Sequence, residues 1–274
     1  MSFMVVIVFL LVVLVGISLG LIGGGGSVLT VPILVYFMGI NPILATSYSL
    51  FIVGSTSMVG AVINYRKGLV CLNTAMLFGL SSITTVYFTR KILLPAIPSV
   101  VYHTDHLQIT KSTATMVLFA LLMLLAAAAM IRNKKKEYIT ETSIFNNTRD
   151  IPKLLFYGIL IGFTTGLLGV GGGFLLIPTL VFILKKPMKE AIGTSLLIIA
   201  LNSLIGFTGD IGHFTMQWNF LIVVTIMAIA GIFVGGFLAK KINGESLKKV
   251  FGWFVLIMGI YIFIREIFFV HTSV

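Results

Sequence analysis

Two glycine-rich breaks inside long apolar runs constrain the fold of this chain more than any other feature. One extends from Gly20 to Pro32 and the other from Gly166 to Pro178, and four glycines and the proline recur at matching positions. Glycine clusters permit backbone with positive φ and allow a ligand or another helix to approach closely. A duplicated break in segments of membrane length is typical of secondary transporters, whose sites lie at discontinuous helices.

The similarity between the two breaks continues along the chain at a fixed offset of 146 residues (166 − 20). From Gly20 to Gly60, 15 of the 41 aligned positions are identical in the second copy. Glycine and proline shared at matched positions are hard to obtain from composition alone. The sequence therefore predicts two homologous repeats, residues 1–132 and 153–274, joined by a cytoplasmic linker at 133–152 within one membrane domain.

Composition indicates an integral membrane protein. Hydrophobic residues make up 58% of the chain and charged residues 10%, whereas soluble domains carry about a quarter charged residues. Apolar runs of this length predict helices, because the strands of a membrane β-barrel alternate apolar and polar residues. The predicted fold class is all-α and polytopic, with apolar runs at about 3–22, 42–63, 69–89, 112–131, 154–168, 190–209, 219–239 and 248–269.

The formal net charge of +11 reflects basic residues that lie in short clusters beside the apolar runs. Membrane topology explains such clusters better than a nucleic-acid partner does, and we expect the bilayer to be the partner. A homo-oligomer stays open. Cys71 is the only cysteine, so an intrachain disulfide is excluded.

The basic residues also discriminate between two ways of threading the chain. Eight full crossings divide the 19 Lys and Arg into about 9 and 10, which nearly erases the inside-positive bias. If each glycine-broken segment instead enters and leaves on the same side, fifteen fall on one side and four on the other, namely Arg90, Lys91, Lys111 and Arg265. Three crossings per repeat then invert the second repeat relative to the first. We predict re-entrant segments, with ordinary broken helices as the alternative.

Each glycine cluster is followed by the start of a new helix, at Ser27 and at Gly173. Free N–H groups and the helix dipole at such ends favour an anion. Two ends that meet near the midplane would form an oxyanion site without a buried Lys or Arg. The alternative is that the glycines only permit tight helix packing. The candidate substrate-binding residues at the breaks are Gly25, Gly26, Ser27, Gly171, Gly172 and Gly173.

With these motifs the sequence resembles the sulfite exporter TauE/SafE family, also known as the toluene-sulfonate uptake permease family. The resemblance covers nearly the whole chain: the breaks followed by proline, then the segments 45–49 and 187–195 that lead into Thr and Ser. It implies a plasma-membrane transporter, by expectation an exporter, of sulfite, thiosulfate, sulfoacetate or another organosulfonate, with no cofactor. The halves differ, since Ser27 and Tyr48 correspond to Gly173 and Thr194, so they cannot contribute identical groups.

Hydroxyl and amide side chains follow each break and form a second group of candidates. Neutral donors suit a transported oxyanion, because binding must be weak enough for release. The alternative for any single Ser or Thr is a bond to its own helix carbonyl. The predicted substrate-binding residues in this group are Ser49 and Ser195, which match by repeat, with Thr194 and Asn202.

Two titratable residues near the end of the sixth apolar run, Asp210 and His213, are candidates for proton coupling. Ionisable groups at membrane depth are functional by default, and histidine titrates near neutral pH. Their alternative role is that of interfacial anchors. A passive anion channel also stays open, as does, more remotely, an intramembrane hydrolase that uses Ser27 with His213. Gly173 in place of Ser27 in the second repeat argues against the hydrolase, and we expect neither catalytic residues nor a metal site.

Overall fold

The computed structural model describes residues 3–24, 26–98, 100–104, 107–132, 151–184, 186–238 and 244–270. Within these ranges the chain is helical apart from one antiparallel hairpin of two strands, which confirms the all-α prediction in its main part. Gly25 and residues 133–150 of the predicted linker lie outside the described residues.

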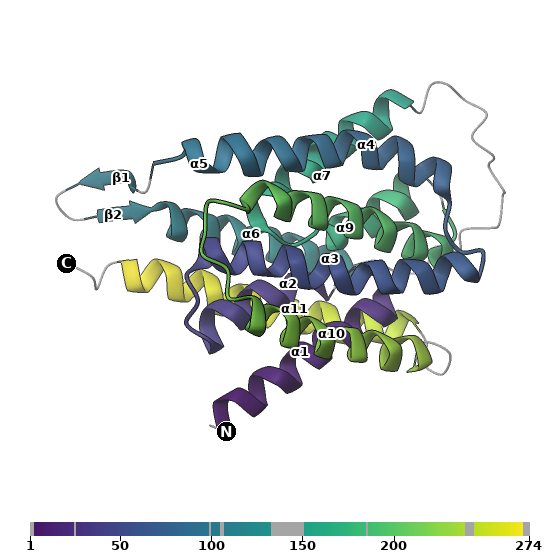
Figure 1. Cartoon of the computed structure of the whole chain (residues 1–274), viewed down its shortest axis with the longest axis horizontal. Helices are drawn as coiled ribbons and strands as arrows, with labels where there is room; N and C mark the ends of the chain where they lie inside the picture. Colours follow the sequence, from purple (N-terminus) through teal and green to yellow (C-terminus); the bar gives the residue numbers. More distant parts are fainter. Residues whose placement is uncertain are drawn as a thin grey trace.

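In the first half a β-hairpin lies between α5 and α6 and projects at the left end of the molecule, and the second half repeats the order of the longer helices without it (Figure 1). The first half contains α1 (Phe3–Ile22), α2 (Ser27–Pro32), the π-helix η1 (Ile33–Phe37), α3 (Pro42–Arg66), α4 (Leu72–Phe88), the π-helix η2 (Thr89–Leu93), α5 (Leu94–Ala96), β1 (Val100–Thr104), β2 (Leu107–Thr110) and α6 (Lys111–Arg132). The second contains α7 (Ile151–Leu168), α8 (Gly173–Pro178), the π-helix η4 (Thr179–Ile183), α9 (Met188–Asp210), α10 (Trp218–Leu238) and α11 (Gly244–Val270).

Four of the described helical segments are long and apolar enough to cross a membrane: α3, Lys111–Ala128 of α6, α9 and α10. Large apolar side chains also cover the outer surface, and Leu80, Leu125 and Phe268 each expose about two thirds or more of their area. Soluble proteins rarely expose apolar surface on this scale. Helix length and surface together describe a polytopic membrane protein.

The helices pack in pairs that combine the two halves of the chain: α1 with α10, α4 with α7, α3 with α9, and α6 with α11. In the pair α1 and α10 the two backbones approach each other directly, because both helices have glycines at the contact. A Cβ on Gly16 would lie 2.0 Å from the carbonyl oxygen of Ala228, and one on Gly235 would lie 2.3 Å from that of Ile17. Small residues of this kind let membrane helices approach backbone to backbone.

Both predicted breaks interrupt a helix at corresponding glycines. α1 ends at Ile22 and is followed by Gly23 with φ +75°, whereas α7 ends at Leu168 and is followed by Gly169 with φ +68°. Residues with a Cβ are strained at such φ values, so the helix stops where glycine permits the turn. In Figure 1, α2 and η1 return toward the left end of the molecule, whereas α8 and η4 return toward the right end.

Candidate functional site

The two glycine breaks touch each other through their backbones, at Gly24 and Gly173. A Cβ on Gly173 would lie 2.5 Å from the carbonyl oxygen of Gly24 and 2.6 Å from its Cα, and a Cβ on Gly24 would lie 2.8 Å from the Cα of Gly173. The absence of a side chain at both positions is therefore what allows the contact. An anion between the breaks would require the two segments to separate.

The other glycine candidates lie against different neighbours. A Cβ on Gly26 would lie 2.6 Å from the carbonyl oxygen of Val15 on α1, so this glycine serves packing within its own segment. Gly171 and Gly172 have φ values of +70° and +71°. The Cβ position of Gly171 lies 2.7 Å from Oγ of Ser203 on α9. The second break therefore lies beside a buried hydroxyl group.

The hydroxyl group of Ser27 is used locally. Its Oγ donates to the carbonyl oxygen of Gly24 at 2.7 Å, and the side chain is fully buried. His213 is exposed, beyond the end of α9, and within the described residues no hydrogen bond joins it to Ser27. The structure does not bring together the pair that a hydrolase would use.

Two of the predicted hydroxyl residues tie α9 to the first half of the chain. Oγ of Ser195 lies 2.9 Å from the carbonyl oxygen of Gly23 at the first break and 2.9 Å from that of Ile192 on its own helix. Oγ1 of Thr194 accepts a hydrogen bond of 2.9 Å from the backbone N–H of Cys71, in the turn between α3 and α4. Ser195 therefore lies at a break, whereas Thr194 faces the turn.

Several buried polar groups on α3 and α9 have no hydrogen-bond partner within the described residues. Oγ of Ser49 is one of them, although its repeat partner Ser195 is bonded. Asn202 accepts from Ser82 at 2.9 Å, while its Nδ2 donors are unpaired. Unsatisfied buried groups cost free energy, so they indicate where water or a ligand binds. The remaining members of this set on α3 and α9 are Thr56, Ser57 and Ser203.

A fully buried ion pair joins η2 to the end of α9. Nη1 of Arg90 lies 3.0 Å from Oδ2 of Asp210, and the two side chains are 0% and 2% exposed. Oγ of Ser47 on α3 donates to the same carboxylate oxygen at 2.5 Å. Nε and Nη2 of Arg90 have no partner within the described residues. The Nη2 atom lies 2.6 Å from the position of a Cβ on Gly169, so this guanidinium reaches the second break.

The anion site between the two helix ends stays a prediction, but a buried arginine, which the sequence did not lead us to expect there, lies beside the second break. Arg90 follows directly after the predicted apolar run 69–89, and the distribution of basic residues placed it on the outer side of the membrane, with no indication that it is buried. The signal that could have located it was Asp210, since a carboxylate at the end of an apolar helix requires a cationic partner.

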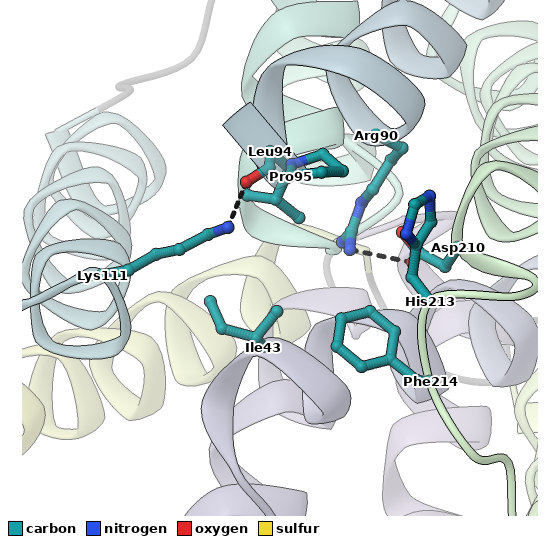
Figure 2. A pocket seen from close by; sticks show the side chains of 8 residues that line it. All are labelled: Ile43, Arg90, Leu94, Pro95, Lys111, Asp210, His213 and Phe214. Carbon is teal, nitrogen blue, oxygen red and sulfur yellow. Dashed lines mark hydrogen bonds and ion pairs between the residues drawn. The ribbon is translucent and has the colours of Figure 1, made fainter. Parts of the chain in front are cut away.

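Asp210 and His213, the predicted proton-coupling residues, line one cavity of about 220 Å³ together with Arg90 and Lys111 (Figure 2). Their environments differ. Asp210 is 1% exposed and ion-paired, whereas His213 is exposed and connected to it by a backbone hydrogen bond of 3.1 Å. A change of charge on Asp210 would therefore alter the buried ion pair, whereas a change on His213 would alter the solvent-exposed rim of the cavity.

Comparison with known proteins matches the family model described as "Sulfite exporter TauE/SafE" to residues 8–262. A "Probable membrane transporter protein" of Xylella fastidiosa (strain Temecula1 / ATCC 700964) is 30% identical over 258 residues, which cover 92% of each chain. The "Probable membrane transporter protein YunE" of Bacillus subtilis (strain 168) is 26% identical over 274 residues, covering 92% of this chain and 93% of the relative. No solved structure matches. The family and these names describe a membrane transporter rather than an enzyme.

Proposed function

Because the chain belongs to the sulfite exporter TauE/SafE family, we propose that it is a secondary transporter of a small sulfur-containing oxyanion or organosulfonate, of the sulfite, thiosulfate and sulfoacetate class. Its direction is export across the bacterial plasma membrane. The observation that carries the proposal is the contact of two glycine-broken segments, through Gly24 and Gly173, in a polytopic membrane protein. Transporters of several folds bind substrate where two discontinuous helices meet near the midplane.

The proposed architecture is a pair of inverted repeats, residues 1–132 and 153–274, each with a re-entrant first segment. The helix pairs support it, because exchanging the repeats converts α1 with α10 into α7 with α4 and leaves the pairs α3 with α9 and α6 with α11 unchanged. The connections support it too. The α3–α4 turn lies at the same end as the start of α9, and the α9–α10 connection lies at the opposite end (Figure 1).

The proposed substrate path passes between the breaks. Ser27, Gly171, Gly172 and Gly173 form its backbone part, and Ser49, Ser195 and Asn202 are its side-chain donors. Gly26, which packs against α1, and Thr194, which faces the α3–α4 turn, are left out of it. Oγ of Ser49 and Nδ2 of Asn202 support this role, since each is buried and has no hydrogen-bond partner among the described residues. Ser195 binds the carbonyl oxygen of Gly23, so separation of the breaks would release its hydroxyl for the anion. Neutral donors bind weakly enough for release.

Proton coupling is the proposed energy source. Asp210 is the group that accepts the proton, and His213 lies at the rim of the cavity. In support, Asp210 is a buried carboxylate paired with Arg90, and no other acid contacts this guanidinium among the described residues. An anion that takes over the guanidinium would leave the carboxylate without its counter-ion, and a proton would then neutralise it. A passive anion channel is the second candidate, and it needs no such coupling.

Flux measurements on purified protein in proteoliposomes test the proposal. Radiolabelled sulfite, thiosulfate and sulfoacetate are presented to vesicles with and without a pH gradient, and protein-free vesicles serve as the control. We expect saturable uptake of at least one compound and accumulation above equilibrium only when the gradient is imposed. Saturable flux that never exceeds equilibrium would favour the channel, and absence of flux for all three compounds would overturn the assigned substrate class.

A further inference from the structure

The cavity beside the ion pair lies where η2, α5, the start of α6 and the α9–α10 connection come together (Figure 2). Its volume is about 220 Å³. A water molecule requires only about 15 Å³ of such space, so an anion of several non-hydrogen atoms fits. The lining residues are Ile43, Arg90, Leu94, Pro95, Lys111, Asp210, His213 and Phe214.

The charges around this cavity do not balance. Among the described residues that line it, Asp210 is the one carboxylate, and it is already paired with Arg90. Lys111 donates to the carbonyl oxygens of Leu94 and, at 3.4 Å, of Ile97, which carry no net charge. An ammonium group has three donors, so one stays available.

The guanidinium of Arg90 supplies donors that nothing in the described structure satisfies. Only Nη1 is bonded, to Asp210 and at 3.5 Å to Ser47, whereas Nε and Nη2 are buried without a partner. Water could accept these hydrogen bonds but would leave the charge of Lys111 unmatched. An oxyanion would do both, because an arginine presents two parallel N–H groups to two oxygen atoms.

We propose that this cavity is an anion-binding site, with Arg90 as its principal ligand and Lys111 as its second cation. The ligand class is a small sulfite or sulfonate, and the choice of sulfur rests on the proposed function. The apolar walls formed by Ile43, Leu94 and Phe214 strengthen the electrostatic attraction and accept the carbon atoms of an organosulfonate.

Its position connects this site to the transport path. Arg90 lines the cavity and also reaches Gly169 at the second break, so one side chain is shared by the path and the cavity. In the proposed topology the cavity opens at the outer end, away from the α3–α4 turn. For an exporter it is therefore the release site, where an anion leaves the breaks and is held before it enters the medium.

Ligand-dependent thermal unfolding of the purified protein in detergent tests the site without any transport. Sulfite under anaerobic conditions and methanesulfonate are titrated at constant ionic strength, with sodium chloride as the balancing salt. Ligands that bind the native state raise the unfolding midpoint in a saturable manner. We expect such a rise for the wild type.

Three variants define the outcome. Arg90→Gln combined with Asp210→Asn keeps the network neutral and should weaken binding at least tenfold, and Lys111→Gln, which leaves the ion pair intact, should weaken it several-fold. Lys91→Gln is the matched control, because Lys91 neighbours Arg90 but is exposed and bonded to Tyr87 at 2.7 Å. A folded double variant with wild-type half-saturation would overturn the site, and so would equal losses in Lys91→Gln and Lys111→Gln.

The same variants separate this inference from the proposed function. Loss of binding in the double variant, together with absence of flux in wild-type proteoliposomes, would retain the anion site and reject sulfur transport. Unchanged binding in the double variant, with normal wild-type flux, would reject the site and retain transport.

Discussion

Replacement of Gly173 by alanine should weaken the contact between the two breaks. The new Cβ would lie 2.5 Å from the carbonyl oxygen of Gly24 and 2.6 Å from its Cα, whereas ordinary contacts of carbon atoms begin near about 3.5 Å. The segments would have to move apart by about 1 Å. Overpacking of this kind costs about 1–3 kcal/mol. The backbone at Gly173 is helical, so alanine itself is acceptable there and the steric term dominates.

Gly236→Ala is the matched control, because Gly236 lies within α10 and nothing lies within 4 Å of its Cβ position. Alanine favours a helix over glycine by about 1 kcal/mol, so this variant should be as stable as the wild type or more stable. Thermal unfolding in detergent provides the assay, and about 1 kcal/mol corresponds to roughly 2–4 °C for large domains. Equal midpoints for Gly173→Ala and Gly236→Ala would refute the contact between the breaks.

Three further predictions concern the polar residues. Ser195→Ala should weaken substrate affinity about fivefold in the flux assay, the equivalent of about 1 kcal/mol for one neutral hydrogen bond; unchanged affinity would remove this serine from the path. Asp210→Asn leaves a buried guanidinium without its ion-pair partner, so it should lower the free energy of unfolding by about 3–5 kcal/mol and abolish gradient-driven accumulation. His213→Gln should change the free energy of unfolding by less than about 0.5 kcal/mol, because its side chain is exposed. Similar losses of stability in both variants would contradict the difference in burial. Burial raises the pKa of the Cys71 thiol, but the hydrogen bond from Thr74 and the nearby charge of Lys186 outweigh burial and lower that pKa. Thr74→Val should therefore move the pH profile of maleimide labelling at Cys71 to higher pH. An unmoved profile would contradict the role of this hydroxyl.

The breaks themselves could be predicted from the sequence, because only glycine adopts positive φ without strain, and clusters of glycine can be recognised directly in the sequence. Gly23 and Gly169 confirm this at matched positions of the two copies. The apolar runs likewise predicted the helices, since a helix in lipid must satisfy its own backbone. These are local properties, and they do not depend on which segments become neighbours.

The partners of the buried polar groups could not be predicted in the same way. Ser49 and Ser195 match by repeat, yet Ser49 has no hydrogen-bond partner in the described part of the chain, whereas Ser195 bonds to Gly23. This difference depends on how α9 packs against the first break, which involves residues 172 positions apart. Arg90 was missed for a related reason, because the stabilising effect of Asp210 on a buried guanidinium arises only after α4 and α9 are brought together.

The transport mechanism proposed above assumes that the two glycine-broken segments are inverted relative to each other, and the accessibility of three single cysteines tests this assumption most directly. Lys67→Cys, Lys186→Cys and His213→Cys are introduced separately into a Cys71→Ser background and labelled with a membrane-impermeant maleimide, from outside in intact cells and from the cytoplasmic side in inside-out vesicles. Positions 67 and 186 should both label only from the cytoplasm, and position 213 only from outside. Labelling of positions 67 and 186 from opposite sides would contradict the inverted repeats and support eight full crossings.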